Sequence, residues 1–169
     1  EFRRVLFRSL EHSHTPQKPR VRRVKLPHTQ IDACRELMRH ECILGPVRDL
    51  LGANLRLHTS KLNLKSAEYG AAVEWHQDWA FYPHTNDDIL AVGVMLDDMT
   101  EDNGALLMIP GSHTGNVLDH HSGGRFVGAI AAGDVDADQA VPVIAPAGSI
   151  SIHHVRMVHG SNQIGRAHV

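Results

Sequence analysis

The sequence has little of several features that would narrow its function at once. Aromatic residues make up 5% of its 169 residues, and there are two cysteines. No apolar run approaches the ~18 residues that a membrane helix needs, so we expect no membrane partner. The formal net charge of −2 provides no basic excess of the kind that binds nucleic acid.

The two cysteines, Cys34 and Cys42, do not form a CxxC or a Cys/His zinc pattern. Both fall in a segment with helical periodicity. Such isolated cysteines are typical of reduced, intracellular proteins, and we therefore expect a cytoplasmic location.

Both ends of the chain look foreign to the rest. Residues 1–9 (EFRRVLFRS) and 164–169 (IGRAHV) resemble peptides translated from sequencing-adapter DNA. Processing scars of this kind are set aside before a fold is considered. The remaining residues, 10–163, are expected to form a single, incomplete domain. On this interpretation Arg166 has no functional role, and no targeting signal can be read from the N-terminus.

Helical periodicity is confined to the N-terminal third. Residues 31–40 carry apolar side chains at positions 31, 34, 37 and 38, which predicts a helix. Gly45-Pro46 is expected to interrupt the chain before a second short helix over residues 47–51. Residues 10–27 are polar and contain proline, so we expect a linker or a frayed edge there.

The period then changes to two, which predicts strands. The first covers residues 58–65, and others are expected over residues 71–76, 89–96, 105–109, 141–145 and 149–154. The nearly continuous apolar run of residues 89–96 predicts a buried central strand. The Gly- and Asp-rich residues 116–138 are a candidate substrate lid. Many short strands separated by turns predict a mainly β sandwich or jelly roll.

The sharpest chemical feature is the pair His76 and Asp78, which lies between two tryptophans. Residues two apart in a strand point to the same face. His159 follows the last predicted strand and can supply a second imidazole. Two His and one carboxylate hold Fe(II) on one face and leave three positions open. The pattern therefore predicts His76, Asp78 and His159 as metal ligands.

Several longer segments resemble one family. They are HTSKLNLK (residues 58–65), WHQDWAFYPH (75–84), DNGALLMIPGSH (102–113) and His159-Gly160-Ser161. In this order they resemble the phytanoyl-CoA dioxygenase family. The resemblance implies a double-stranded β-helix, a cupin-like jelly roll with the metal at its open mouth. It also implies a dioxygenase that uses Fe(II), 2-oxoglutarate and O2 to hydroxylate a small organic substrate, releasing succinate and CO2.

The resemblance assigns further site residues. It places contacts to 2-oxoglutarate at Asn63 and Ser161. Lys61 and Lys65 share the alternating face of Asn63 and can bind a carboxylate, Lys65 on the co-substrate and Lys61 in the substrate pocket. Solvated edge lysines are the alternative for these two.

Aromatic and histidine positions complete the expected site. Trp79 and Tyr82 match pocket-lining aromatic positions of the family, with plain core packing as the alternative. His153 and His154 are adjacent in a predicted strand, so at most one of them faces the site.

One family feature is absent. The family anchors the distal carboxylate of 2-oxoglutarate with an arginine eleven residues after the second histidine. Counted from His159 this is position 170, one residue past Val169. A bidentate guanidinium–carboxylate pair is hard to replace. We therefore expect this chain to bind 2-oxoglutarate weakly and to lack the last strand of the roll.

Three other functions compete. A halogenase needs the carboxylate position empty, and Asp78 fills it. A zinc hydrolase could use the same three ligands with an activated water, but the HTSKLNLK and PGSH segments argue against it. The main alternative is a non-catalytic jelly-roll module that binds a metal.

Overall fold

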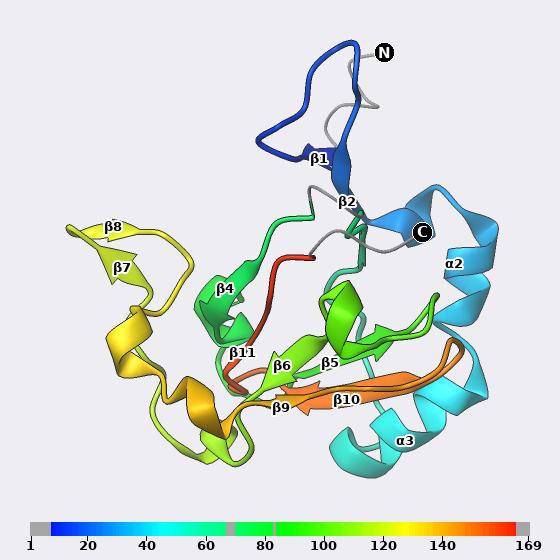
Figure 1. Cartoon of the computed structure of the whole chain (residues 1–169). Coiled ribbons are helices and arrows are strands. Elements are labelled where there is room, and N and C mark those ends of the chain that lie inside the picture. Colours follow the sequence, from blue (N-terminus) through cyan, green and yellow to red (C-terminus); the bar gives the residue numbers. More distant parts are fainter. Residues whose placement is uncertain (1–7, 67–69, 83, 165–169) are drawn as a thin grey trace. The chain divides into compact units, whose positions relative to one another are not determined.

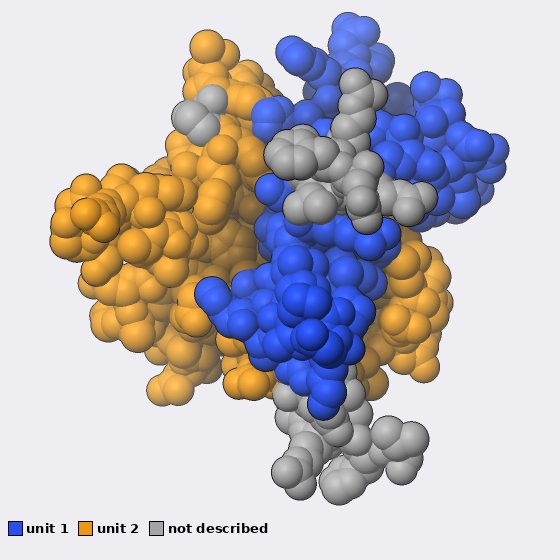
Figure 2. Space-filling model, turned by 90° about the horizontal axis from the view of Figure 1, so that it is seen from above, with its two compact units in different colours: residues 1–71, 168 blue, residues 72–167, 169 orange. Residues whose placement is uncertain are grey.

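The computed structural model describes residues 8–66, 70–82 and 84–164. It divides the chain into two compact units, coloured separately in Figure 2. Unit 1 contains Glu1–Ala71 and His168, and unit 2 contains Ala72–Ala167 and Val169. The segments that resemble adapter sequence fall mostly outside the described residues, and their foreign origin stays a prediction.

Unit 1 contains an antiparallel three-stranded sheet in the order β1-β2-β3. The strands are β1 (Arg8–Leu10), β2 (Val21–Lys25) and β3 (Lys61–Asn63). The prediction of a linker or frayed edge over residues 10–27 is therefore wrong. Val24 lies opposite Leu62 across the β2–β3 pair, and this partner, far along the chain, supplies the hydrogen bonds that local pattern could not reveal.

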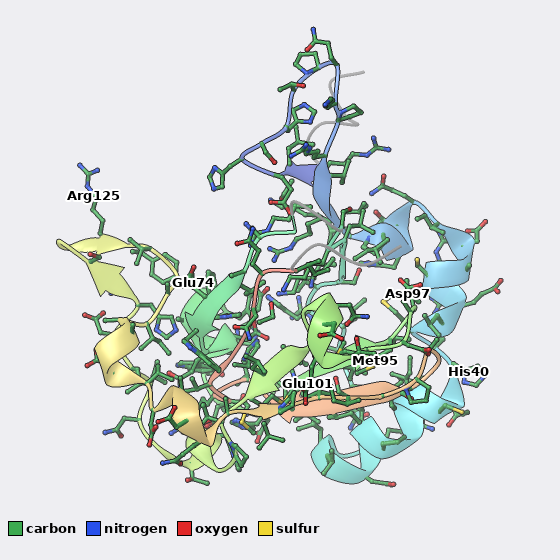
Figure 3. The ribbon with its side chains drawn as sticks, in the orientation of Figure 1. His40, Glu74, Met95, Asp97, Glu101 and Arg125 are labelled. Carbon is green, nitrogen blue, oxygen red and sulfur yellow. The ribbon has the colours of Figure 1, made fainter. Side chains whose placement is uncertain are left out.

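The helices of unit 1 are η1 (Pro27–Thr29), α2 (Asp32–Leu37) and α3 (Glu41–Leu51). The first predicted helix is present as α2, but the predicted interruption at Gly45-Pro46 is wrong, because α3 runs through it. Proline removes a single i→i−4 hydrogen bond there. The helix keeps its N-terminal cap, since the Cys42 N–H donates to Nδ1 of His40 at 3.3 Å. Figure 3 shows His40 between the two helices.

The described residues of unit 2 form three sheets, all antiparallel (Figure 1). Its strands are β4 (Val73–His76), β5 (Leu90–Val94), β6 (Leu106–Met108), β7 (His121–Ser122), β8 (Arg125–Phe126), β9 (Val141–Pro142), β10 (Ile150–His154) and β11 (His159–Ser161). The four-stranded sheet has the order β4-β11-β6-β9, β5 pairs with β10, and β7 with β8. The short helices are η2 (Asp78–Phe81), η3 (Glu101–Asn103), η4 (Ser112–Thr114), η5 (Ala132–Asp134) and η6 (Ala137–Gln139).

The predicted strand over residues 89–96 is shorter and less buried than expected. All residues of β5 are half-buried, and Leu96 beyond it is 61% exposed. Within the described ranges β5 pairs with β10 alone. The run is thus one strand of a two-stranded ribbon. It is not a central strand, because a central strand would be buried on both faces.

The core of unit 2 lies against the four-stranded sheet. Ile109, Ile130 and Val158 are buried together, and Trp75 packs against them. A Cβ added at Gly160 would lie 2.9 Å from the Val73 carbonyl oxygen and 3.3 Å from the Trp75 ring. Glycine at this position therefore lets the indole lie against β11. Of the helices that the structure describes, none is long and apolar enough to span a membrane.

Candidate metal centre

Strand pairing brings the two predicted histidine ligands together. His76 is the last residue of β4 and lies directly opposite His159, the first residue of β11. Their ring centroids are 4.2 Å apart. Both side chains are buried, His76 with 8% and His159 with 6% exposure. Residues 83 positions apart in the sequence thus share one point on the sheet because of the register.

Asp78 joins them from the same side of the backbone. Gln77 is extended, with φ −117° and ψ 129°, and Asp78 then begins η2. The alternation of the strand thus persists one residue beyond β4. The Asp78 carboxylate lies 3.8 Å from Nε2 of His76 and 3.9 Å from Nε2 of His159. One ligand atom from each of the three residues lies within 4.8 Å of the others, so the structure brings the whole predicted triad together.

Backbone carbonyls fix which nitrogen of each ring faces the centre. Nδ1 of His76 donates to the Glu74 carbonyl oxygen, and Nδ1 of His159 donates to the Met157 carbonyl oxygen, each at 2.8 Å. A carbonyl only accepts, so Nδ1 carries the hydrogen in both rings. Nε2 is then the nitrogen able to coordinate a metal. The Glu74 side chain is exposed on β4 (Figure 3).

The protonation state of His159 also suits a ligand. Burial, followed by the nearby His76 and His153, lowers the pKa of His159 to about 4. The ring is therefore neutral at neutral pH, and neutral imidazole is the form that binds metals.

Gln77, for which the sequence predicted no role, is fully buried. Its Nε2 donates to the Arg156 carbonyl at 2.7 Å and to the Asn116 carbonyl at 3.3 Å. Its Oε1 accepts from the Leu118 N–H at 2.8 Å. The side chain points away from His76 and Asp78 and ties the segment between them to two distant loops. No local signal identifies it, because its partners lie 39 to 79 positions away.

His120 completes the same network. The Gln77 N–H donates to Nε2 of His120 at 2.9 Å, and Nδ1 of His120 donates to the Leu118 carbonyl at 2.8 Å. The ring is 2% exposed and uses both nitrogens within the protein. This histidine is structural.

Aromatic side chains flank the centre on the side of η2. The Phe81 ring lies edge-on to His76, with 5.8 Å between centroids, and also to Phe126 of β8, at 5.2 Å. The predicted pocket residues Trp79 and Tyr82 are half-buried in and just after η2. Their part in a substrate pocket stays a prediction.

The β7–β8 hairpin belongs to the predicted lid segment, residues 116–138. Arg125 points outward from its tip (Figure 3), while Phe126 contacts the Phe81 ring. The hairpin therefore packs beside the centre through an aromatic side chain, although its role as a lid stays a prediction.

The predicted 2-oxoglutarate contacts are divided between the units. Ser161 lies on β11 two residues after His159 and is half-buried. Asn63, Lys65 and Lys61 belong to unit 1, so their role at the centre stays a prediction. Arg23 Nε donates to Oδ1 of Asn63 at 2.8 Å. Burial, then the charge of Arg22, lowers the pKa of Lys65 to about 8.

Known proteins resemble the chain over most of its length. The family model "Phytanoyl-CoA dioxygenase (PhyH)" matches residues 2–165. A probable alpha-ketoglutarate-dependent hypophosphite dioxygenase of Stutzerimonas stutzeri is 47% identical over 147 residues, which are 83% of this chain and 51% of that protein. The L-proline trans-4-hydroxylase of Streptomyces griseoviridis is 39% identical over 103 residues, 58% of this chain and 38% of that protein. The chain thus spans about half, or less, of the curated relatives it matches.

Solved structures agree with the fold. EctD from S. alaskensis with bound Fe superposes with a TM-score of 0.74 at 25% identity, covering 89% of this chain and 54% of that one. The same protein with 2-oxoglutarate and 5-hydroxyectoine gives 0.71 at 26% identity, covering 88% and 52%. The predicted jelly roll with N-terminal helices is confirmed. The chain belongs to the phytanoyl-CoA dioxygenase family.

Proposed function

We propose that this chain forms the metal-binding part of an Fe(II)- and 2-oxoglutarate-dependent dioxygenase, with His76, Asp78 and His159 as iron ligands. The observation that carries the proposal is the buried triad, whose ligand atoms lie within 4.8 Å of one another. Family membership and the relatives named for alpha-ketoglutarate support it.

The donor set fits Fe(II). Two imidazoles and one carboxylate would hold the ion and would leave room on it for a 2-oxo acid and O2. When bound, iron supplies the redox chemistry that activates O2. The chain's own residues hold the ligands in place: the Glu74 and Met157 carbonyls orient the two rings, and Gln77 fixes the backbone between His76 and Asp78.

The overall reaction balances as follows. Loss of CO2 from 2-oxoglutarate yields succinate and two electrons, and hydroxylation of the substrate yields two more. These four electrons reduce O2, and one oxygen atom enters succinate while the other enters the substrate. The low exposure of the triad favours this coupling, because water is kept from the reacting groups.

The substrate is proposed to be a small polar molecule. The relative that matches 83% of the chain is named for hypophosphite, a small oxyanion with P–H bonds, and others are named for L-proline and ectoine. Insertion of oxygen into a P–H bond supplies two electrons, as insertion into a C–H bond does. We therefore include a small oxyanion beside the small organic substrate that the family resemblance implies.

Co-substrate binding is proposed for Ser161, Asn63 and Lys65. Ser161 shares the β11 face of His159 by the two-residue period, which supports its assignment. A cytoplasmic location is also proposed, and the free cysteines Cys34 and Cys42 support it.

The test is anaerobic titration with Fe(II) followed by excess 2-oxoglutarate, observed through the visible charge-transfer band of the chelate. We expect the chain to bind Fe(II) and the Asp78→Ala variant to lose roughly 100-fold or more in affinity, because a ligand loss exceeds the 10–100-fold effect of an outer-shell change. Asp138→Ala removes an exposed carboxylate of η6 and is the matched control. Unchanged iron affinity in Asp78→Ala would refute the triad. Iron binding that never gives the band would show that this chain does not bind 2-oxoglutarate, and it would leave the triad standing.

A further inference from the structure

Strand β10 carries buried polar atoms that the metal centre described above does not use. His153 is 8% exposed, and neither of its ring nitrogens has a hydrogen-bond partner in the described part of the chain. The same holds for Oγ of Ser151, which has no solvent-exposed surface. A buried polar group left without a partner destabilises the folded state. Three such atoms on one strand indicate a site where a bound ligand would supply the hydrogen bonds that the protein does not.

These atoms lie on the face of β10 that points to the metal centre. Nε2 of His153 is 3.8 Å from Oδ2 of Asp78, and its ring centroid is 4.6 Å from that of His159. Ser151 shares this face because it is two residues away. His154 points to the opposite face, where its Nε2 lies 4.0 Å from Oδ2 of Asp87. The structure thus identifies His153 as the one of the two adjacent histidines that faces the centre.

The neighbouring strand provides no side-chain partner for this polar pair. Across the β10–β5 ladder, His153 lies opposite Ala91 and Ser151 lies opposite Gly93. A Cβ added at Gly93 would come within 2.7 Å of Oγ of Ser151. Glycine at position 93 therefore leaves room for the Ser151 hydroxyl, and neither Gly93 nor Ala91 has a side chain that could form a hydrogen bond.

His153 also differs from the two histidines of the triad. His76 and His159 each donate from Nδ1 to the carbonyl two residues earlier, which presents Nε2 to a metal. Nδ1 of His153 has no such bond among the described residues. His153 is also outside the set whose ligand atoms all lie within 4.8 Å of one another. It is therefore placed beside the metal ligands without the carbonyl bond that orients them.

We propose that His153 and Ser151 together bind the oxygen atoms of the substrate beside Asp78. The substrate class is the small oxyanion that the proposed function includes. The inference rests on the proposed function. An imidazole N–H and a serine O–H donate to oxyanion oxygens, and bonds of this charge-assisted kind are about twice as strong as neutral ones. An apolar substrate would leave the same atoms unsatisfied.

The experiment measures binding of hypophosphite to the Co(II)-loaded chain by isothermal titration calorimetry. Nitrogen and oxygen donors bind Co(II), and its visible spectrum separately reports metal occupancy. We expect His153→Phe to weaken hypophosphite binding roughly tenfold to a hundredfold, the worth of a hydrogen bond to a charged group. His153→Gln keeps an N–H donor and is expected to stay within about fivefold of the unaltered chain by the same reasoning. His154→Phe, on the opposite face of the same strand, is the matched control and should not alter binding.

The outcomes separate the two proposals. Failure of the unaltered chain to bind Co(II) contradicts the proposed function. If Co(II) binds but hypophosphite does not, or if His153→Phe binds hypophosphite as tightly as the unaltered chain, the role of His153 is overturned and the metal centre stands. A loss of Co(II) affinity in His153→Phe likewise overturns it, because His153 would then serve the metal.

Discussion

At the scale of single residues, the position between the two N-terminal ligands is as informative as the ligands. The alternation that directs His76 and Asp78 to one side directs Gln77 to the other, where its side chain makes three hydrogen bonds. All three residues from His76 to Asp78 are thus held in place. His76 and Asp78 are held by the centre that they form, and Gln77 is held by backbone groups of residues 116, 118 and 156.

Gln77→Leu tests this arrangement. The substitution keeps the volume but removes all three side-chain hydrogen bonds, leaving the partly buried Leu118 N–H and Arg156 carbonyl without their partner. We expect the free energy of unfolding to fall by about 3 kcal/mol, since each unsatisfied buried group costs about 1–3 kcal/mol. Urea denaturation measures it. Gln139→Leu is the control, because Gln139 is exposed and bonds to Asp136; equal losses in the two variants would contradict the role of Gln77.

At the scale of elements, the β7–β8 hairpin is joined to the centre through aromatic rings. Phe126 contacts Phe81, and Phe81 contacts His76. Gly128 follows the hairpin with φ +68°, and a Cβ there would lie 2.6 Å from the Phe81 ring. The glycine therefore allows both the left-handed turn and the close approach of the ring.

Gly128→Ala is expected to destabilise the chain by about 1–2 kcal/mol through its left-handed backbone alone, with further loss from the displaced Phe81 ring. Thermal unfolding measures the total loss of stability, and a lower affinity for Fe(II) would report movement of His76. Gly133→Ala is the matched control, since no atom lies within 4 Å of its added Cβ and its φ is not positive. A Gly128→Ala protein as stable as this control would show that the contact is unimportant.

The sequence predicted what depends on local alternation. His76 and Asp78 were expected on one face because they are two positions apart in a strand, and the extended backbone of Gln77 places them so. What it missed depends on distant partners: β2 forms because β3 pairs with it, and Gln77 bonds to loops far along the chain. Ser151 and His153 alternate visibly in the sequence, yet which face of β10 meets Asp78 follows from the fold alone.

At the scale of the whole molecule, the half-buried charge of Lys65 makes stability depend on pH. Burial, followed by the charge of Arg22, lowers its pKa from 10.5 to about 8. Below pH 8 the ammonium is charged in both states, and the folded state bears the desolvation. Between pH 8 and 10.5 the unfolded chain binds more protons than the folded one, so the free energy of unfolding contributed by this group rises with pH.

Lys65→Met removes this dependence. We expect the variant to be more stable than the unaltered chain below pH 8 by about 1–2 kcal/mol, less than the pKa difference alone implies because a half-buried ammonium retains part of its hydration. The advantage should shrink as pH rises from 8 to 10.5. Urea denaturation across this range measures both slopes, with Lys25→Met, at an exposed position of β2, as control. A stability difference that is constant with pH would mean that the charge of Lys65 is not desolvated in the folded protein.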